Sequence, residues 1–172
     1  MKKTDRHGNR GTTTLEIVVS MGVVVLFLSG VFLMNTQVLS LLRGSLESTA
    51  SLRVLNDRAE HLRASTWSQI TTASYHSGSV LFLPPDSAEG LAGLTETIQV
   101  TAHLAPPSSI APITVQRDRA GTVTTTSAGS TQLAAEPSVR VDLTASWIAK
   151  GGRQKMRQLS LFFGEGGISG KR

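Results

Sequence analysis

The chain has 172 residues, with 17 Lys and Arg against 12 Asp and Glu, a net charge of +5 at pH 7 and no cysteine. This length suits one domain, or a small domain with an appendage. The absence of cysteine excludes disulfides, thiolate metal sites and a cysteine nucleophile. Aromatic residues make up only 5% of the chain and the positive charge is small and dispersed, so nucleic acid is not an expected ligand of the chain as a whole.

An apolar run near the N-terminus is the strongest feature of the sequence. It extends from Ile17 to Met34, and no charged residue occurs between positions 17 and 42. A helix of ~20 apolar residues crosses the hydrocarbon core of a bilayer, so we expect a membrane-spanning segment at about residues 15–38. The run is longer than the apolar region of roughly 7–15 residues in a secretory signal, so we expect it to be retained.

A short basic leader precedes the apolar run. Residues 1–11 carry four basic side chains, Lys2, Lys3, Arg6 and Arg10, and a single acidic one, Asp5. Positive charge next to a membrane span keeps that end in the cytoplasm. The sequence therefore predicts a single-pass protein of the cytoplasmic membrane, with its N-terminus inside and the chain after about residue 43 exported.

Glu16 stands at the mouth of the apolar run. An ionised carboxylate in hydrocarbon costs about 2.5–3.5 kcal/mol, so a glutamate at this edge requires a reason. One interpretation is that Glu16 lies at headgroup depth and reaches into water. The other is that its charge has a function.

The segment Gly11, Thr12, Thr13, Thr14, Leu15 and Glu16, set between a short basic leader and an apolar helix, resembles the start of type IV prepilin-like proteins. This family includes type IV pilins, minor pilins and the pseudopilins of type II secretion. The resemblance implies that a prepilin peptidase cuts after Gly11 and methylates the new N-terminus at Thr12. It also implies that Glu16 is the family's glutamate at mature position five. The chain departs from the usual pattern at Thr12, where the family has Phe or Met, and at Thr14, where it has an apolar residue.

A single long helix is predicted over residues 12–64. No proline occurs before Pro84, and past the membrane Leu39, Leu42 and Leu46 begin a stripe of apolar residues in steps of three and four. Such a helix would be ~80 Å long, which far exceeds a membrane. We therefore expect its outer half to pack under the domain that follows. On its other side Arg43 and Glu47 stand four apart and can interact.

Residues 65–172 are predicted to form a small β-rich head domain. Strands are expected at Ser79–Leu83, Glu96–Leu104 and Ile113–Arg117, which are separated by turn-rich pieces. The Ser- and Thr-rich stretch at 120–131 is expected to be an exposed loop or an edge strand. The predicted fold class is thus α+β, with a long N-terminal helix packed on an antiparallel sheet, which is also what the resemblance to pilins implies.

A C-terminal hairpin is the clearest β element. Apolar and polar residues alternate from Val139 to Trp147, and Leu159, Leu161 and Phe163 alternate on the return strand. A two-residue loop at Gly151 and Gly152 would put the two apolar sets on opposite faces. We therefore predict a three-residue turn or a bulge near Gly152, with Leu143 opposite Leu161 and Ala145 opposite Leu159. Trp147 is expected to be buried against the long helix.

No set of residues indicates catalysis, a cofactor or a metal. The histidines at 7, 61, 76 and 103 lack ligand spacing and are expected to be solvated, and no nucleophile elbow, phosphate-binding loop or zinc-protease motif occurs. Lys150, Arg153, Lys155 and Arg157 cluster at the hairpin turn. Contact with DNA phosphates is one interpretation of this cluster, but we favour a charged edge strand that resists aggregation.

Two functions from different classes are consistent with these observations. The first is a structural subunit, a minor pilin or pseudopilin that assembles with other such subunits into an extracytoplasmic filament. The second is an unprocessed, signal-anchored cell-envelope protein whose β domain binds a ligand or scaffolds a complex.

Overall fold

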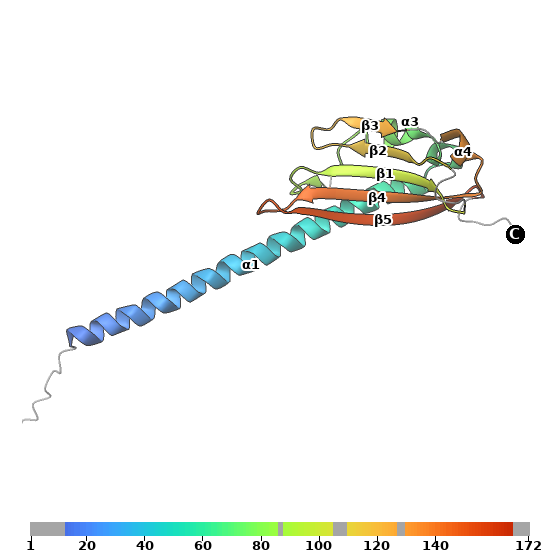
Figure 1. The fold of residues 1–172 in the computed structure, drawn as a ribbon. Coiled ribbons are helices and arrows are strands. Elements are labelled where there is room, and N and C mark those ends of the chain that lie inside the picture. The colour runs from blue at the N-terminus through green and yellow to red at the C-terminus, as the bar shows by residue number, and fades with distance from the viewer. Residues whose placement is uncertain (1–12, 86–87, 105–109, 127–129, 167–172) are drawn as a thin grey trace, which may run out of the picture. The chain divides into compact units, whose positions relative to one another are not determined.

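The computed structural model describes residues 13–85, 88–104, 110–126 and 130–166 (Figure 1). The chain divides into two units, Met1–Arg43 and Gly44–Arg172. One helix and a five-stranded antiparallel sheet are its main elements, so the predicted fold class is confirmed.

Helix α1 runs from Thr14 to Arg63, close to the predicted 12–64. At the start of the helix, the Thr13 carbonyl accepts hydrogen bonds from the amides of Glu16 (2.9 Å) and Ile17 (3.2 Å). The helix contains a window of mean hydropathy 2.7 of which no part is buried, so it is long and apolar enough to span a membrane.

The sheet forms the centre of the second unit. Its order is β3-β2-β1-β4-β5, and every neighbouring pair is antiparallel. The strands comprise β1 (Thr95–Ala102), β2 (Ile113–Arg117), β3 (Val123–Thr126), β4 (Ser138–Ile148) and β5 (Gln154–Gly164). The predicted strands at 96–104 and 113–117 are therefore confirmed. The stretch at 120–131 supplies the short edge strand β3 and the beginning of helix α4 (Ser130–Ala134).

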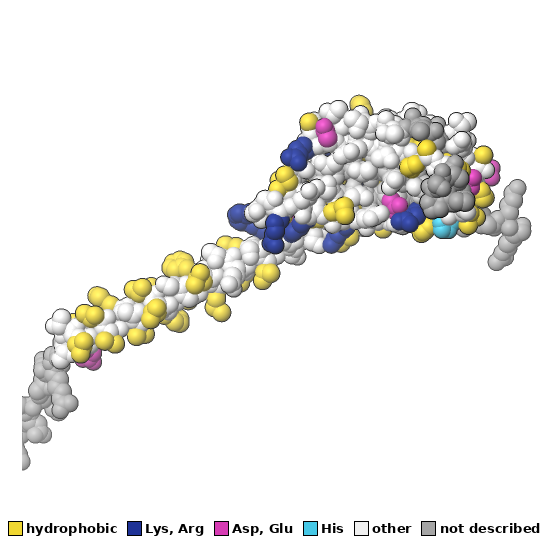
Figure 2. Space-filling view, viewed as in Figure 1, with side chains coloured by type: hydrophobic (Ala, Val, Ile, Leu, Met, Phe, Trp, Pro, Cys, Tyr) yellow, Lys and Arg dark blue, Asp and Glu magenta, His cyan; other side chains and the backbone are white. Residues whose placement is uncertain are grey.

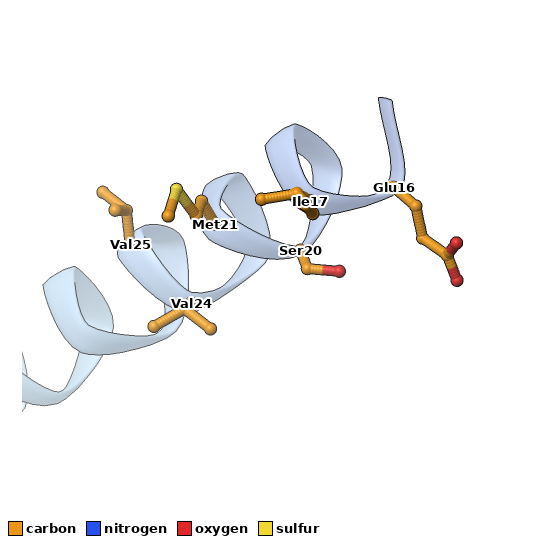
Figure 3. Close-up of a pocket in the computed structure, with 6 residues that line it drawn as sticks. All are labelled: Glu16, Ile17, Ser20, Met21, Val24 and Val25. Carbon is orange, nitrogen blue, oxygen red and sulfur yellow. The ribbon is translucent and has the colours of Figure 1, made fainter. Parts of the chain in front are cut away.

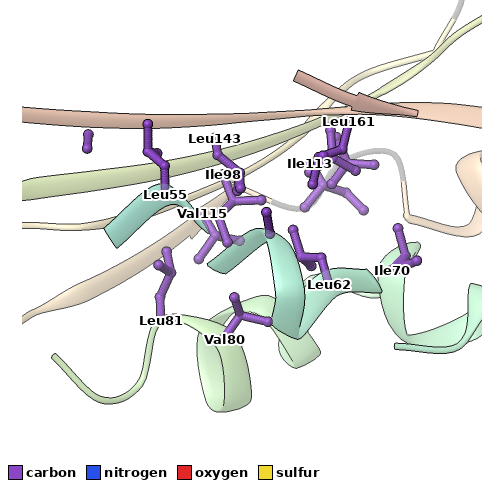
Figure 4. Close-up of a cluster of buried hydrophobic side chains, with 14 of the residues drawn as sticks. Leu55, Leu62, Ile70, Val80, Leu81, Ile98, Ile113, Val115, Leu143 and Leu161 are labelled. Carbon is purple, nitrogen blue, oxygen red and sulfur yellow. The ribbon is translucent and has the colours of Figure 1, made fainter. Parts of the chain in front are cut away.

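The hydrophobic core lies between one face of the sheet and the second half of α1. Leu55, Ala59 and Leu62 of α1 are buried in steps of four and three, which place them on one side of the helix, and Val54 is buried beside them. Figure 4 shows Leu55 and Leu62 between the sheet residues above them and the segment with Val80 and Leu81 below. The outer half of the helix therefore packs in the core from about residue 51 onward, as expected, whereas Leu39, Leu42 and Leu46, which begin the predicted stripe, are exposed.

The prediction of a strand at Ser79–Leu83 is wrong. After α1 the chain forms two short helices, α2 (Trp67–Ile70) and α3 (Ala73–Tyr75), and then a π-helical turn, η1 (His76–Val80). Of these elements, α3 and η1 contact β2 and β3. Val80 and Leu81 are buried because they cover the side of α1 that faces away from the sheet, so their apolar character reflects core packing and not strand pairing.

The C-terminal hairpin has the predicted loop length and a different register. The Ala149 amide donates to the Arg153 carbonyl at 2.8 Å, which leaves the three residues 150–152 in the loop. Gly151 and Gly152 both have positive φ (101° and 77°), a conformation that favours glycine. Leu143 consequently pairs with Leu159, and not with Leu161 as predicted. The predicted pairs are wrong by two residues, which is the shift that keeps every side chain on its face.

A charged cluster is buried beside this core. The Glu96 carboxylate accepts from Arg58 Nε at 2.9 Å and from Arg117 Nη1 at 3.2 Å, and its side chain is only 5% exposed. Arg58 also donates to the carbonyls of Val80 (2.5 Å) and Leu83 (2.8 Å). Arg58 therefore connects α1 to β1, to the end of η1 and to the segment that follows η1.

Candidate functional site: the start of the long helix and the helix–hairpin contact

Of the residues predicted for processing and assembly, the structure describes only Glu16. Gly11 and Thr12 lie outside the described residues. Glu16 lies in the first turn of α1, where the partial positive charge of a helix N-terminus stabilises a carboxylate.

The surroundings of Glu16 are a shallow, mostly apolar surface on one side of α1. Figure 3 shows the Glu16 carboxylate directed away from the helix axis at the first turn, with the other side chains following along the helix. That surface is lined by Glu16, Ile17, Ser20, Met21, Val24 and Val25. A carboxylate next to an apolar helix surface can pair with a cation that reaches it when another apolar helix packs there, because removal of water strengthens the attraction.

A second polar site joins the helix to the hairpin within the second unit. Glu47 accepts a hydrogen bond from Lys155 Nζ at 3.0 Å, and its other bonds come from the Trp147 indole Nε1 (3.4 Å) and the Lys150 amide (3.5 Å). The bond from Lys155 lowers the pKa of Glu47 below its ordinary value, against the effect of partial burial, and the bonds from Trp147 and Lys150 lower it further. Trp147 itself is 4% exposed, so its predicted burial against the helix is confirmed.

Arg157 makes the next contact along the helix. Its guanidinium donates to the Ser48 carbonyl and to the Ser48 hydroxyl, each at 3.0 Å. We name the set of Glu47, Ser48, Trp147, Lys155 and Arg157 the helix latch. It holds α1 against the hairpin through one buried ring and two cationic side chains.

The helix latch changes the interpretation of the basic cluster at the hairpin. Figure 2 shows Lys and Arg side chains gathered at one end of the second unit. Lys155 and Arg157 of this cluster contact α1, whereas Lys150 and Arg153 are exposed. The sequence did not indicate the partners of Lys155 and Arg157, because the spacing of Arg43 and Glu47 offered a nearer pairing for Glu47. The predicted burial of Trp147 on the helix was the one available signal.

The histidines differ from the prediction at one position. His7 lies outside the described residues, and His61 and His103 are exposed. His76 is fully buried, so its predicted solvation is wrong. Its Nε2 donates to the Ile70 carbonyl at 2.7 Å, and burial lowers its pKa. Among the described residues, no group of three or more His, Asp and Glu could hold a metal ion.

Comparisons of the chain with family models, with curated proteins and with solved structures find no match.

Proposed function

We propose that the chain is a minor pilin or pseudopilin, a structural subunit that primes or joins a type IV pilus-like or type II secretion filament. In this proposal a prepilin peptidase removes residues 1–11 and methylates Thr12. The protein then resides in the bacterial inner membrane, with its N-terminus cytoplasmic and its head extracytoplasmic. Its partners are the peptidase, membrane lipid and other pilin or pseudopilin subunits.

The observation that carries the proposal is the double role of α1. One uninterrupted helix of 50 residues supplies an exposed apolar segment, suited to lipid, and the central core element of a small antiparallel β domain. A subunit that must leave the bilayer and pack with its neighbours needs an apolar helix that remains attached to a folded head. The resemblance of residues 6–42 to prepilin-like proteins supports the same function.

Glu16 gives this proposal a mechanism. Cleavage after Gly11 would create an amine at Thr12, four residues before the Glu16 carboxylate. Within one subunit the amine already lowers the cost of the carboxylate near lipid. Between subunits, the Thr12 amine of one chain can pair with Glu16 of another in a low-dielectric setting, where the attraction greatly exceeds its value in water. This pairing would set the axial offset between neighbouring helices.

The mass of the mature protein tests the proposal. We expect membrane fractions to contain a chain that lacks residues 1–11, and we expect Gly11→Leu to leave an inserted but uncut precursor, because a side chain at this position obstructs approach to the bond. Gly8→Leu is the matched control, since it alters a leader glycine away from the cut. An intact leader on the correctly inserted wild-type chain would instead favour the signal-anchored envelope protein.

A further inference from the structure

One end of the second unit carries exposed positive charge at the turn between β4 and β5. Lys150 and Arg153 flank the two glycines of this turn, and both side chains are exposed. Among the described residues neither side chain has a hydrogen bond or an ion pair, since Lys150 bonds to Glu47 through its backbone amide. These two cations therefore take no part in the contacts that hold the head together, unlike Lys155 and Arg157 of the helix latch.

A third exposed cation lies at the same end of the sheet. Arg119 belongs to the turn between β2 and β3. A β-carbon on Gly93 would lie 3.9 Å from Cζ of Arg119 and 3.4 Å from Cδ1 of Ile148, which is the last residue of β4. Arg119 is therefore close to the place where the β4–β5 turn begins, and Figure 2 shows Lys and Arg side chains gathered at this end.

The carboxylates near this end do not offset the three cations. Glu47 accepts from Lys155, and Asp118 Oδ1 accepts from two amides of its own turn at 2.9 and 2.8 Å. Glu89 is exposed in the loop that leads to β1. Exposed positive charge therefore exceeds exposed negative charge at this end of the described head.

The opposite end of the head has the reverse balance. Glu60 lies in the last turns of α1, Glu136 precedes β4 and Glu165 follows β5. Arg63 and Arg140 lie at the same end, and each is held in an ion pair with a neighbouring carboxylate. The described part of the head thus carries opposite charge at its two ends, so an anionic surface would attract it by the β4–β5 turn.

The positive end is also the part of the head that is tethered most closely to the apolar run. The uncharged stretch ends at Leu42, and Glu47, which accepts a bond from the Lys150 amide at 3.5 Å, follows five residues later. Five residues in any conformation span at most about 18 Å. Whatever direction the apolar run takes, the covalent chain keeps the β4–β5 turn near its end. When that run crosses a bilayer, the turn is within reach of the lipid headgroups.

We propose that Lys150, Arg153 and Arg119 dock the head on anionic phospholipid headgroups at the surface of the membrane that α1 enters. A Lys or Arg near such a surface strengthens binding about fivefold, and a guanidinium can bind a phosphate through two N–H groups. Gly151 and Gly152 place no side chain between the two turn cations that would hold them away from the surface. The inference rests on the membrane insertion in the proposed function, and not on cleavage or filament assembly.

Two other roles of these cations fit the structure less well. Charges that blunt an edge strand stand on the strand, as Lys155 and Arg157 do, whereas Lys150 and Arg153 lie between the end of β4 and the start of β5. A DNA duplex presents a long row of phosphates, and proteins that bind it neutralise many of them. The three exposed cations of two short turns form a patch too small for that purpose.

Energy transfer between the head and the lipid headgroups tests the proposal. The chain has no cysteine, so Gln154→Cys gives a single labelling site beside the turn, and Gln132→Cys gives one in α4, near the other end. Each full-length chain is placed in vesicles of phosphatidylcholine, alone or with about a third of phosphatidylglycerol, that carry a trace of headgroup-labelled acceptor lipid. We expect transfer from position 154 to rise in the anionic vesicles and to lose this rise in about 1 M salt, and transfer from position 132 not to rise.

Charge variants locate the contact on the turn. Lys150→Gln and Arg153→Gln should each reduce the ratio of docked to undocked heads about fivefold, and together about 25-fold. Both leave the helix latch intact, because Lys150 contacts Glu47 through its amide alone. Arg63→Gln removes one positive charge at the other end and is the matched control, with no change expected. Exchange of the two turn residues, Lys150→Arg with Arg153→Lys, keeps the charge and should retain docking.

The proposal is overturned if transfer from position 154 is equal in neutral and anionic vesicles, or if the double glutamine variant responds as the wild type does. Binding of a short DNA duplex that is lost in the same variant, without any response to anionic lipid, would assign the cations to DNA and would also overturn it.

Extraction with alkaline carbonate separates this inference from the proposed function. A wild-type chain that is extracted from the vesicles contradicts membrane residence, and so contradicts the proposed function and this inference together. A chain that stays in the membrane without docking its head contradicts this inference alone.

Discussion

The ammonium group of Lys155 lies 3.0 Å from Oε2 of Glu47, although 108 residues separate the two in the chain. Glu47 belongs to α1 and Lys155 to the last strand, so this bond joins the first element of the second unit to the last. The Glu47 side chain is 14% exposed and that of Lys155 is 41% exposed. The pair is therefore sheltered from solvent on the glutamate side only.

Acid should weaken this junction. Because the pKa of Glu47 is lower in the folded chain than its ordinary value of 4.5, its contribution is fully present above that value and is lost as pH falls through the lower folded pKa. We expect Glu47→Gln to lower the free energy of unfolding by about 1 kcal/mol near neutral pH. The difference from wild type should shrink as the pH falls below 4.5 through the lower folded pKa of Glu47, because the carboxylate then becomes protonated and uncharged like the glutamine. Urea unfolding of the full-length chain in micelles measures both values, and a difference independent of pH would show that the charge of Glu47 contributes nothing.

Among the residues of the helix latch, substitution of Trp147 should lower the free energy of unfolding the most. Its side chain is buried against α1, so Trp147→Ala should lower the free energy of unfolding by about 3–5 kcal/mol. Met156→Ala, on the same hairpin and 69% exposed, is the control and should change it by less than about 0.5 kcal/mol. Similar values for the two variants would mean that the indole is not packed on the helix.

Removal of Glu96 should leave Arg58 and Arg117, whose side chains are only 12% and 13% exposed, without their counter-charge. Glu96→Gln should therefore destabilise the head by about 3–5 kcal/mol, the usual cost of breaking a buried ion pair from one side. Glu60→Gln removes an exposed glutamate that pairs with Arg63 and should cost at most about 1 kcal/mol. Thermal unfolding of both variants gives the comparison, and an equal, small loss would indicate that water reaches Arg58 and Arg117.

Glu16 should matter for assembly and not for insertion. An unpaired carboxylate costs only a few kcal/mol, so we expect Glu16→Ala to insert and lose its leader normally while its incorporation into filaments fails or slows. Glu16→Gln should behave in the same way, because it keeps the shape and removes the charge. Incorporation is measured by immunoblotting of sheared filaments from cells that contain the partner subunits. Wild-type levels for both variants would make Glu16 an interfacial residue without a role in assembly.

Elements whose apolar spacing repeats over many residues were predictable from the sequence. Features that depend on contacts between distant parts of the chain were not. The helix ends were found within two residues because apolar spacing and the absence of proline extend over many turns. The segment at 79–83 was assigned to a strand because a short apolar run has the same composition in a strand and in a buried turn. The observed hairpin register differs from the predicted one by two residues. The alternation of apolar and polar residues determines which face each side chain lies on, but the turn determines which residues pair across the two strands.

The candidate sites show the same division. Glu16 stood out because a charge beside an apolar run is a local anomaly. The burial of Glu96 and His76 could not be read from their neighbours, since their partners Arg58 and Ile70 lie on other elements. Lys155 and Arg157 were correctly placed on an edge strand, but their contacts with Glu47 and Ser48 required the fold.

The helix latch also has a consequence for synthesis. Its three hairpin residues, Trp147, Lys155 and Arg157, are translated after almost all of the chain, whereas the apolar segment of α1 is translated first. Until the ribosome has completed β5, the apolar stripe of α1 with Val54 and Leu62 has no complete cover, and a truncated product never acquires one. Closure of the head therefore requires that β5 has been made, and a helix without these contacts presents a hydrophobic surface that chaperones and proteases can recognise.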